Sequence, residues 1–200
     1  YVTPEPETIN KFLEEYTFER IEEWFNKLIT GFKRWTDYTF DERHKRTESI
    51  RELKFPYEYR EGQKNLCVSV YRAIEDNTNL YIQAPTGVGK TLSTVFPAVQ
   101  ALGQQMSDKI FYLTSKTITR TVAEDTYAIL RDNGLHMRTV TLTAKDKICP
   151  LDERNCNPVA CPYAKGHFDR INDAVYDIIT SQMVIGRDNV MEYANRNNVC

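Results

Sequence analysis

One stretch constrains the fold of this chain more than any other: NLYIQAPTGVGKTLS, which runs from Asn79 to Ser93. A short apolar run is followed by a glycine-containing turn and then by a helical pattern, an order that places a phosphate at a helix N-terminus. Gly87 and Gly89 allow backbone angles that a Cβ would block, so successive N–H groups can turn inward on the phosphate. The stretch therefore predicts a phosphate-binding loop between a strand and a helix.

The residue types in APTGVGKT indicate the chemistry of this loop. Lys90 can reach the β- and γ-phosphates of a nucleotide, and the Thr91 hydroxyl can ligate Mg²⁺. We therefore predict ATP and Mg²⁺ as cofactors and assign the catalytic roles to Lys90 and Thr91. A working enzyme of this kind also needs an acidic residue at the end of a later apolar strand. No such run follows Lys90, so this piece is expected to bind nucleotide weakly and not to turn it over.

Short apolar runs alternate with helical patterns between residues 55 and 144. Strands are expected over NLYIQA, KIFYLT and MRTVTLTA, and helices over residues 91–106 and 118–132. This alternation predicts an α/β fold in which helices cover a parallel sheet. Gly134 is expected to cap the second helix, and Pro97 should kink or break the first one. Two further helices are expected near residues 168–181 and 189–197.

Residues 1–54 read as helical because apolar residues recur at spacings of three and four. Thr8 and Thr17 are the expected N-caps, and Gly31 is a weak point. The segment DERHKRTESIRELK mixes charge signs, so residues 41–54 are expected to be a solvated face or a connector.

Composition excludes several classes of protein. The 200 residues are 41% hydrophobic and 27% charged, with no apolar run near the ~20 residues that span a bilayer. The start of the chain lacks a basic leader and an apolar stretch, so we predict a cytoplasmic protein with no membrane partner. A net charge of −2 argues neither for nor against nucleic acid, which needs only a local basic groove. Without an initial Met, the chain reads as a piece of a longer protein.

The five cysteines are unevenly placed. Cys149, Cys156, Cys161 and Cys200 follow the point where the periodicity is lost, whereas Cys67 lies on an apolar helical face and is expected in the core. In a reducing compartment such thiols serve metal binding or catalysis more often than disulfides. Structural zinc and a [4Fe–4S] cluster both remain open on spacing, although zinc ligands are more often paired as CxxC.

Five motifs occur in a set order: FPYEYREGQ, APTGVGKT, YLTSKTITR, LTAKDKIC and CNPVACPYAKGHFDRIN. Over residues 55–200 they resemble the first motor domain of the XPD- and DinG-type iron–sulfur DNA helicases of superfamily 2. The resemblance implies a partial RecA-like P-loop domain with a small, mostly helical iron–sulfur insertion and a helical N-terminal extension. The implied parts are an extension over residues 1–54, the first half of the RecA-like domain over 55–147, and the cluster domain over 148–200.

The resemblance also assigns residues. The four cluster ligands are Cys149, Cys156, Cys161 and Cys200. The implied nucleotide-binding residues are Gln63 as adenine reader, Arg60, Ala84, Pro85, Thr86, Gly87, Val88, Gly89, Lys90 and Thr91. The implied DNA-binding residues are Thr114, Lys116, Thr117 and Arg120, although Ser115 and Lys116 stand where the family usually carries an arginine.

The function implied by the resemblance is ATP-driven 5′-3′ translocation on single-stranded DNA with duplex unwinding, in DNA repair or replication. Expected partners are single strands and strand–duplex junctions, the second RecA-like domain of the same chain, and a nuclease-like N-terminal domain as in some bacterial members. Two other functions remain open. One is a zinc-stabilised P-loop ATPase that remodels RNA or protein, and the other is a non-catalytic module that docks a partner.

Overall fold

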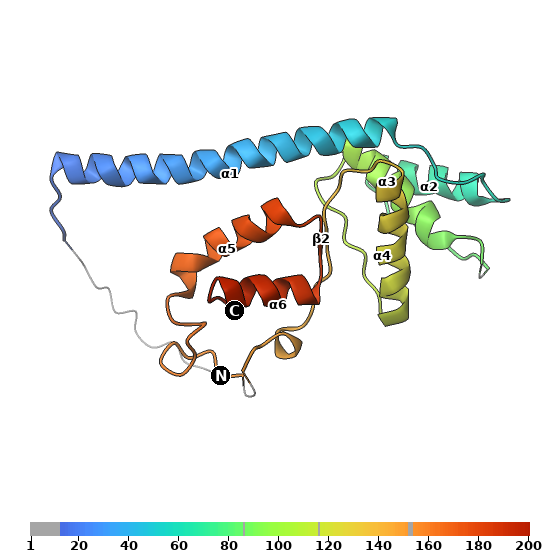
Figure 1. The fold of residues 1–200 in the computed structure, drawn as a ribbon. Coiled ribbons are helices and arrows are strands. Elements are labelled where there is room, and N and C mark those ends of the chain that lie inside the picture. The colour runs from blue at the N-terminus through green and yellow to red at the C-terminus, as the bar shows by residue number, and fades with distance from the viewer. Residues whose placement is uncertain (1–12, 86, 116, 152–153) are drawn as a thin grey trace, which may run out of the picture. The chain divides into compact units, whose positions relative to one another are not determined.

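The structure is a computed structural model that describes residues 13–85, 87–115, 117–151 and 154–200. The chain divides into two compact units, Tyr1–Phe40 and Asp41–Cys200. The described elements, shown in Figure 1, are α1 (Phe18–Glu52), α2 (Gln63–Glu75), α3 (Lys90–Gly103), α4 (Thr117–Asp132), β1 (Thr139–Val140), the 3₁₀ helix η1 (Lys145–Lys147), α5 (His167–Ser181), β2 (Val184–Ile185) and α6 (Arg187–Arg196).

Helix α1 is continuous through Gly31, so the predicted weak point does not interrupt it. Thr17 caps the helix as predicted, because its Oγ1 accepts a hydrogen bond from the Arg20 N–H at 3.4 Å. The predicted cap Thr8 lies outside the described residues. Within the first unit most of the large apolar side chains of α1, including those of Phe18 and Trp24, are exposed, while Trp35 is partly buried.

The end of α1 corrects one expectation. The mixed charges of residues 41–54 predict a solvated face or connector, but Ile50 is only 1% exposed and Leu53 is also buried. Gln100 fixes this end of the helix, since its Nε2 donates to the Leu53 carbonyl at 3.0 Å. Two apolar residues three positions apart share one helix face, so they suffice to bury the last turn even in a charged segment.

The core of the second unit is formed by the end of α1, by α3 and α4, and by the segment after α4. Its buried members are Ile50, Leu53, Val95, Val99, Leu102, Tyr127, Leu130 and Leu135. The pKa of Tyr127 is raised to about 12, mainly because its side chain is buried in this core. Helix α3 runs through Pro97, so the predicted break is absent. Gly134 ends α4 as predicted, with φ of 100° and a Leu135 N–H that donates to the Leu130 carbonyl.

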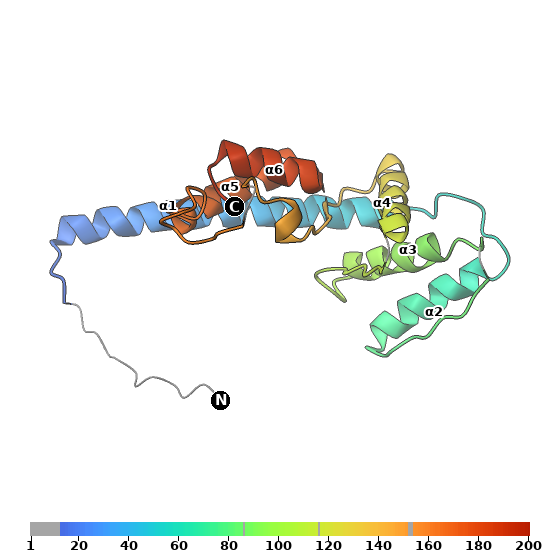
Figure 2. The same cartoon turned by 90° about the horizontal axis from the view of Figure 1, so that it is seen from below.

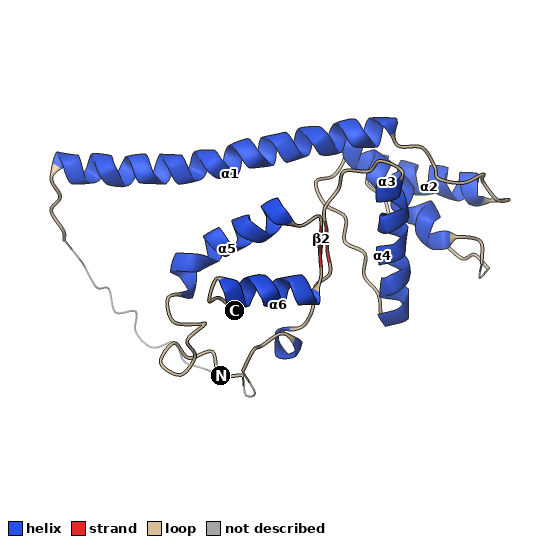
Figure 3. Cartoon of the chain, viewed as in Figure 1, coloured by secondary structure: helices blue, strands red, loops and turns tan. Residues whose placement is uncertain are grey.

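The sheet is much smaller than the sequence predicts, as Figure 3 shows. Among the described residues it consists of β1 and β2, paired parallel with Thr139 opposite Val184. The segments NLYIQA and KIFYLT do not form strands in that part of the chain, and Tyr81 and Leu113 are 92% and 88% exposed. An apolar run gives a segment the tendency to form a strand. The strand forms only when a second segment, here one distant in sequence, pairs with it through backbone hydrogen bonds. The fold is mostly helical and consistent with a partial RecA-like domain.

The helices pack in neighbouring pairs. Helices α2 and α3 lie side by side, as do α5 and α6 (Figure 2).

The bounds of four helices differ little from expectation. Helices α3 and α4 begin within a residue of the predicted helices, and α5 and α6 match the helices expected near residues 168–181 and 189–197.

Arg138 connects the small sheet to the part of α1 that lies in the second unit. Its Nε donates to the Gln182 carbonyl at 2.9 Å and its Nη2 to Glu42 Oε2 at 3.2 Å. Burial alone would raise the pKa of Glu42, but the hydrogen bond and charge of His136, with Arg138 and Lys45, hold it below its usual value. The strands are therefore held in place by an ionic contact beside the core.

No helix within the described ranges is long and apolar enough to cross a membrane.

Candidate nucleotide-binding site

The phosphate-binding loop has the backbone geometry that its glycines predict. Gly87 and Gly89 have φ values of 84° and 74°, in the left-handed region that favours glycine. Gly89 is the N-cap of α3, and its carbonyl accepts the Ser93 N–H at 3.1 Å. Because α3 starts at Lys90, the unpaired N–H groups of its first turn lie beside the loop, where they can bind an anion. Thr86, also assigned to the loop, lies outside the described residues.

Lys90 lies across the loop that precedes it. Its Nζ donates to the Ala84 carbonyl at 2.9 Å and to the Pro85 carbonyl at 2.6 Å. These contacts hold the ammonium group at the mouth of the loop, beside the start of α3. A compact cation on a flexible stem can exchange such carbonyl contacts for phosphate oxygens.

Gln63 and Arg60 support the loop by donating hydrogen bonds to its carbonyl groups. The Gln63 Oε1 accepts a hydrogen bond from the Arg60 N–H at 2.8 Å, and its Nε2 donates to the Val88 carbonyl at 2.9 Å. Arg60 Nη1 donates to the Gly87 carbonyl at 2.7 Å. A Cβ at Gly89 would overlap Gln63 Nε2, so the absence of a side chain there allows this close approach.

The sequence predicts Gln63 as a reader of adenine, whereas the structure places both ends of its amide on the main chain and leaves it 6% exposed. A primary amide offers two donors and two acceptor positions, so one of each remains. Gln63 therefore supports the loop itself, a role that its position in the sequence did not indicate.

A cleft of about 650 Å³ opens over this loop. It is lined by Tyr57, Glu58, Arg60, Gln63, Gly87, Gly89, Lys90, Thr91, Leu92, Val122, Thr126 and Ile129. Its volume is in the range of small-molecule pockets. Arg60 and Gln63, which the family resemblance assigns to the nucleotide, line this cleft together with Tyr57.

Sequence reasoning missed one wall of the cleft. Val122, Thr126 and Ile129 all come from α4 and also line the cleft. Their spacing of four and three residues places them on one helix face, which was a usable signal. Of the lining residues only Glu58 is acidic, and it precedes the loop.

The structure describes the side chains of two of the residues predicted to bind DNA, Thr114 and Arg120. Thr114 is exposed before α4, Thr117 begins α4, and Lys116 lies outside the described residues. Arg120 follows in α4, where its Nε lies 3.5 Å from Glu124 Oε1. Arg120 also lines a second cavity, separate from the cleft over the loop.

The four cysteines predicted to bind a metal do not form a site in this structure. Cys161 is 5% exposed, Cys149 is half-buried, and Cys156 and Cys200 are exposed. In the part of the chain that the structure describes, no three Cys, His, Asp or Glu side chains are placed to hold a metal ion. The described thiols are therefore not arranged as a four-thiolate site.

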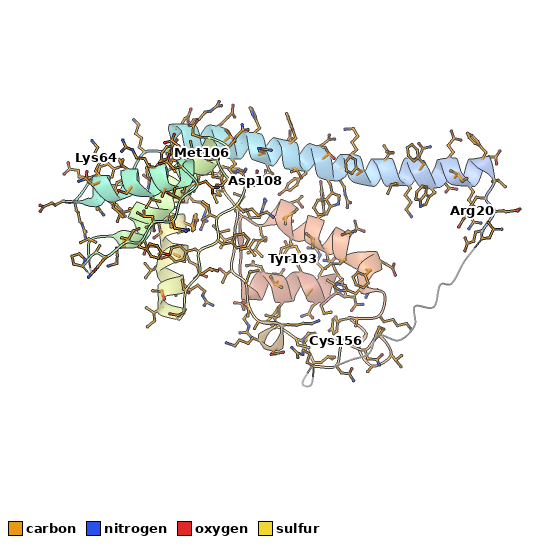
Figure 4. The ribbon with its side chains drawn as sticks, turned by 180° about the vertical axis from the view of Figure 1, so that it is seen from behind. Arg20, Lys64, Met106, Asp108, Cys156 and Tyr193 are labelled. Carbon is orange, nitrogen blue, oxygen red and sulfur yellow. The ribbon has the colours of Figure 1, made fainter. Side chains whose placement is uncertain are left out.

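Two of these thiols do lie near the same cation. The pKa of Lys145 is raised first by the hydrogen bond that it donates to the Cys156 sulfur, and then by the charges of Cys200 and Cys156. Cys200 Sγ is 3.9 Å from His167 Nδ1. Figure 4 shows Cys156 in the loop between η1 and α5. These neighbours of the thiols could not be read from cysteine spacing alone.

Comparison with known proteins finds similarity to helicases in the region that holds this site. Residues 61–156 match the DEAD/DEAH box helicase family. Over 47 residues the chain is 49% identical to a probable ATP-dependent helicase of Methanocaldococcus jannaschii, a stretch that covers 23% of this chain and 7% of that protein. No solved structure matches. In the region that holds the nucleotide loop, the chain is therefore similar to ATP-dependent helicases of the DEAD/DEAH box kind.

Proposed function

We propose that this chain is part of an ATP-dependent DNA helicase of the XPD and DinG type, which moves 5′-3′ along single-stranded DNA and unwinds duplexes in repair or replication. The braced phosphate loop carries the proposal. Gln63 and Arg60 hold its carbonyls while Lys90 and the first turn of α3 lie at its mouth. The match of residues 61–156 to DEAD/DEAH box helicases supports the helicase part of this proposal.

In this function each group at the cleft has a task. Lys90 would neutralise the β- and γ-phosphates, and the Thr91 hydroxyl would ligate Mg²⁺. Tyr57 lines the cleft beside Gln63 and offers a ring face to the base. Since Glu58 is the one acid among the cleft-lining residues, we propose that the acid completing the Mg²⁺ site comes from elsewhere in the full protein.

ATPase and unwinding assays on the whole protein test the proposal. ATP hydrolysis should rise on addition of single-stranded DNA, and a duplex with a 5′ tail should be unwound faster than one with a 3′ tail. The assignment of Thr114, Lys116, Thr117 and Arg120 to DNA, and the division at residues 54 and 147, stay predictions. Stimulation by RNA alone, or hydrolysis indifferent to any nucleic acid, would instead favour a remodelling ATPase.

Changing Gln63 to glutamate should weaken ATP binding and erase any preference for ATP over GTP. The carboxylate keeps an acceptor for the Arg60 N–H but loses the donor to the Val88 carbonyl, where it adds repulsion between two acceptors. Titration with ATP and GTP by calorimetry measures both effects. The matched control is Gln104→Glu on the exposed end of α3, which should change neither. An unaltered preference in Gln63→Glu would remove the adenine-reading role.

We propose that Cys149, Cys156, Cys161 and Cys200 bind a [4Fe–4S] cluster, as the family resemblance implies. Protein purified without oxygen should contain iron and sulfide, and Cys156→Ser should lower both to background. Cys67→Ser is the matched control, since Cys67 is buried in α2 away from the cysteine-bearing segment. Stoichiometric zinc without iron would contradict the cluster and favour a zinc-stabilised ATPase.

A further inference from the structure

A second cavity, of about 510 Å³, opens beside the small sheet. It is lined by Arg120, Glu124, Thr141, Thr143, Lys147, Gly186 and Arg187. Thr141 directly follows β1 and Gly186 directly follows β2, and the two strands are parallel. The carboxyl ends of parallel strands meet at one edge, which is where open α/β sheets bind their ligands. The cavity therefore occupies a favourable position for a binding site that the nucleotide does not use.

The cavity concentrates positive charge on an otherwise slightly acidic chain. Arg120, Lys147 and Arg187 come from α4, η1 and α6, and Glu124 is the one acid among the lining residues. Three cations and one anion give the lining a formal charge of +2, whereas the whole chain carries −2. Charge focused in a concave surface attracts ions of opposite sign more strongly than the net charge indicates.

The side chains around the cavity are tied to one another. The Arg187 Nε donates to the Lys147 carbonyl at 3.2 Å, which joins α6 to η1. The Thr141 hydroxyl donates to Glu124 Oε1 at 2.7 Å, which joins the end of β1 to α4. The same Glu124 oxygen lies 3.5 Å from Arg120 Nε. The cations thus project from elements that are connected to one another around the opening.

We propose that this cavity is a phosphate subsite for the backbone of single-stranded nucleic acid, in which Lys147 and Arg187 join Arg120. The subsite rests on the proposed function and extends it to residues beyond the motifs that predicted DNA contact. Exposed cations spread around an open cavity suit a polyanion, whose binding is driven by release of its counterions. A free phosphate ion would need a more enclosed set of donors.

Glu124 opposes the phosphate in this subsite. Its carboxylate lines the cavity and offsets part of the charge of Arg120. Glu124→Gln keeps an oxygen for the Thr141 hydroxyl and removes the negative charge. Single strands should therefore bind this variant more tightly, by several-fold, than the unaltered chain. A purely structural role for Glu124 would give no gain in affinity.

The test uses fluorescence anisotropy with a labelled oligodeoxythymidine over a range of salt concentrations. Lys147→Gln with Arg187→Gln should weaken binding about tenfold at 0.1 M salt, on the order of the counterion effect of two neutralised phosphates. The slope of log affinity against log salt concentration should fall by about 1.4, or ~0.7 for each phosphate of the single strand that the variant no longer neutralises.

Each cavity variant has a control variant that changes the net charge by the same amount at residues outside the cavity. Lys64→Gln with Lys109→Gln removes two exposed cations outside both cavities (Lys64 is labelled in Figure 4), and Asp125→Asn neutralises the exposed neighbour of Glu124. Neither control should match the effect of its cavity variant. Equal effects would reduce the result to net charge and overturn the subsite. Thermal unfolding by circular dichroism verifies that each variant is folded.

Labelled ATP separates this inference from the proposed function. Lys147 and Arg187 do not line the nucleotide cleft, so their variant should bind labelled ATP as the unaltered chain does. A chain that binds labelled ATP but no oligonucleotide would overturn the subsite and leave the nucleotide site intact. Binding of inorganic phosphate at these residues, in a chain that does not bind the oligonucleotide, would also overturn the proposed subsite. A chain that binds neither ATP nor the oligonucleotide would overturn both proposals.

Discussion

Replacing Lys90 with alanine should lower the affinity of this chain for a labelled ATP analogue by at least about a hundredfold. Lys90 is the cation at the mouth of the loop, held there by the Ala84 and Pro85 carbonyls. Hydrogen bonds to charged groups contribute roughly 1.5–3 kcal/mol each, and about 2.7 kcal/mol corresponds to a hundredfold change in affinity. Fluorescence titration of the purified chain measures the loss directly.

Two controls give this result its meaning. Lys109→Ala removes an exposed lysine outside the cleft and should leave ATP affinity unchanged. Urea unfolding of Lys90→Ala shows how far the two carbonyl contacts also stabilise the loop. If Lys90→Ala bound ATP as tightly as the unaltered chain, the lysine would have only that structural role. The assignment of the nucleotide to this cleft would then be wrong.

The second large effect is expected in the core, where Gly103 packs against Ile50. Ile50→Ala should lower the free energy of unfolding by about 2–5 kcal/mol, because Ile50 is 1% exposed and its loss leaves a cavity. Gly103→Ala should also destabilise, by about 1–3 kcal/mol, since a new Cβ would overlap the Ile50 Cγ2 and lie 3.0 Å from its Cβ. Urea unfolding at equilibrium gives both values.

The double variant tests whether the two residues share one space. Ile50→Ala with Gly103→Ala should lose less stability than the sum of the single losses, because the new methyl group occupies part of the space that isoleucine leaves. Gly31→Ala is the matched glycine control in α1, where a Cβ meets no neighbour and gains helix propensity. Strict additivity in the double variant would contradict the packing of α1 against α3.

The nucleotide loop could be predicted because its signals are local. Gly87, Gly89 and Lys90 act on backbone and side chain within a few residues of one another, and the structure places them as expected. The brace by Gln63 was less predictable, since it depends on the approach of α2 to the loop. The sequence identified the residue but not its contacts with the main chain.

The sheet and the metal site are the parts that sequence could not fix. A strand needs a partner, and β2 pairs with β1 from a segment where the sequence predicts no strand. Tyr81 and Leu113 carry a strong local strand signal yet remain exposed and outside any strand in the described residues. Likewise, the family resemblance assigns Cys156 and Cys200 to one metal centre, while their mutual positions depend on how the intervening helices fold.

The β1–β2 ladder has a consequence for the order of folding. Its two rungs join residues 139–140 to residues 184–185, so pairing must close the loop formed by residues 141–183, which holds three of the cysteines. Closing a loop of this length costs about 3 kcal/mol of chain entropy, roughly 1 kcal/mol more than closing the shorter connection between α2 and α3. We therefore expect the helices to form early and the ladder late. Any ligand that draws the loop together would shorten that final search and speed the last step of folding.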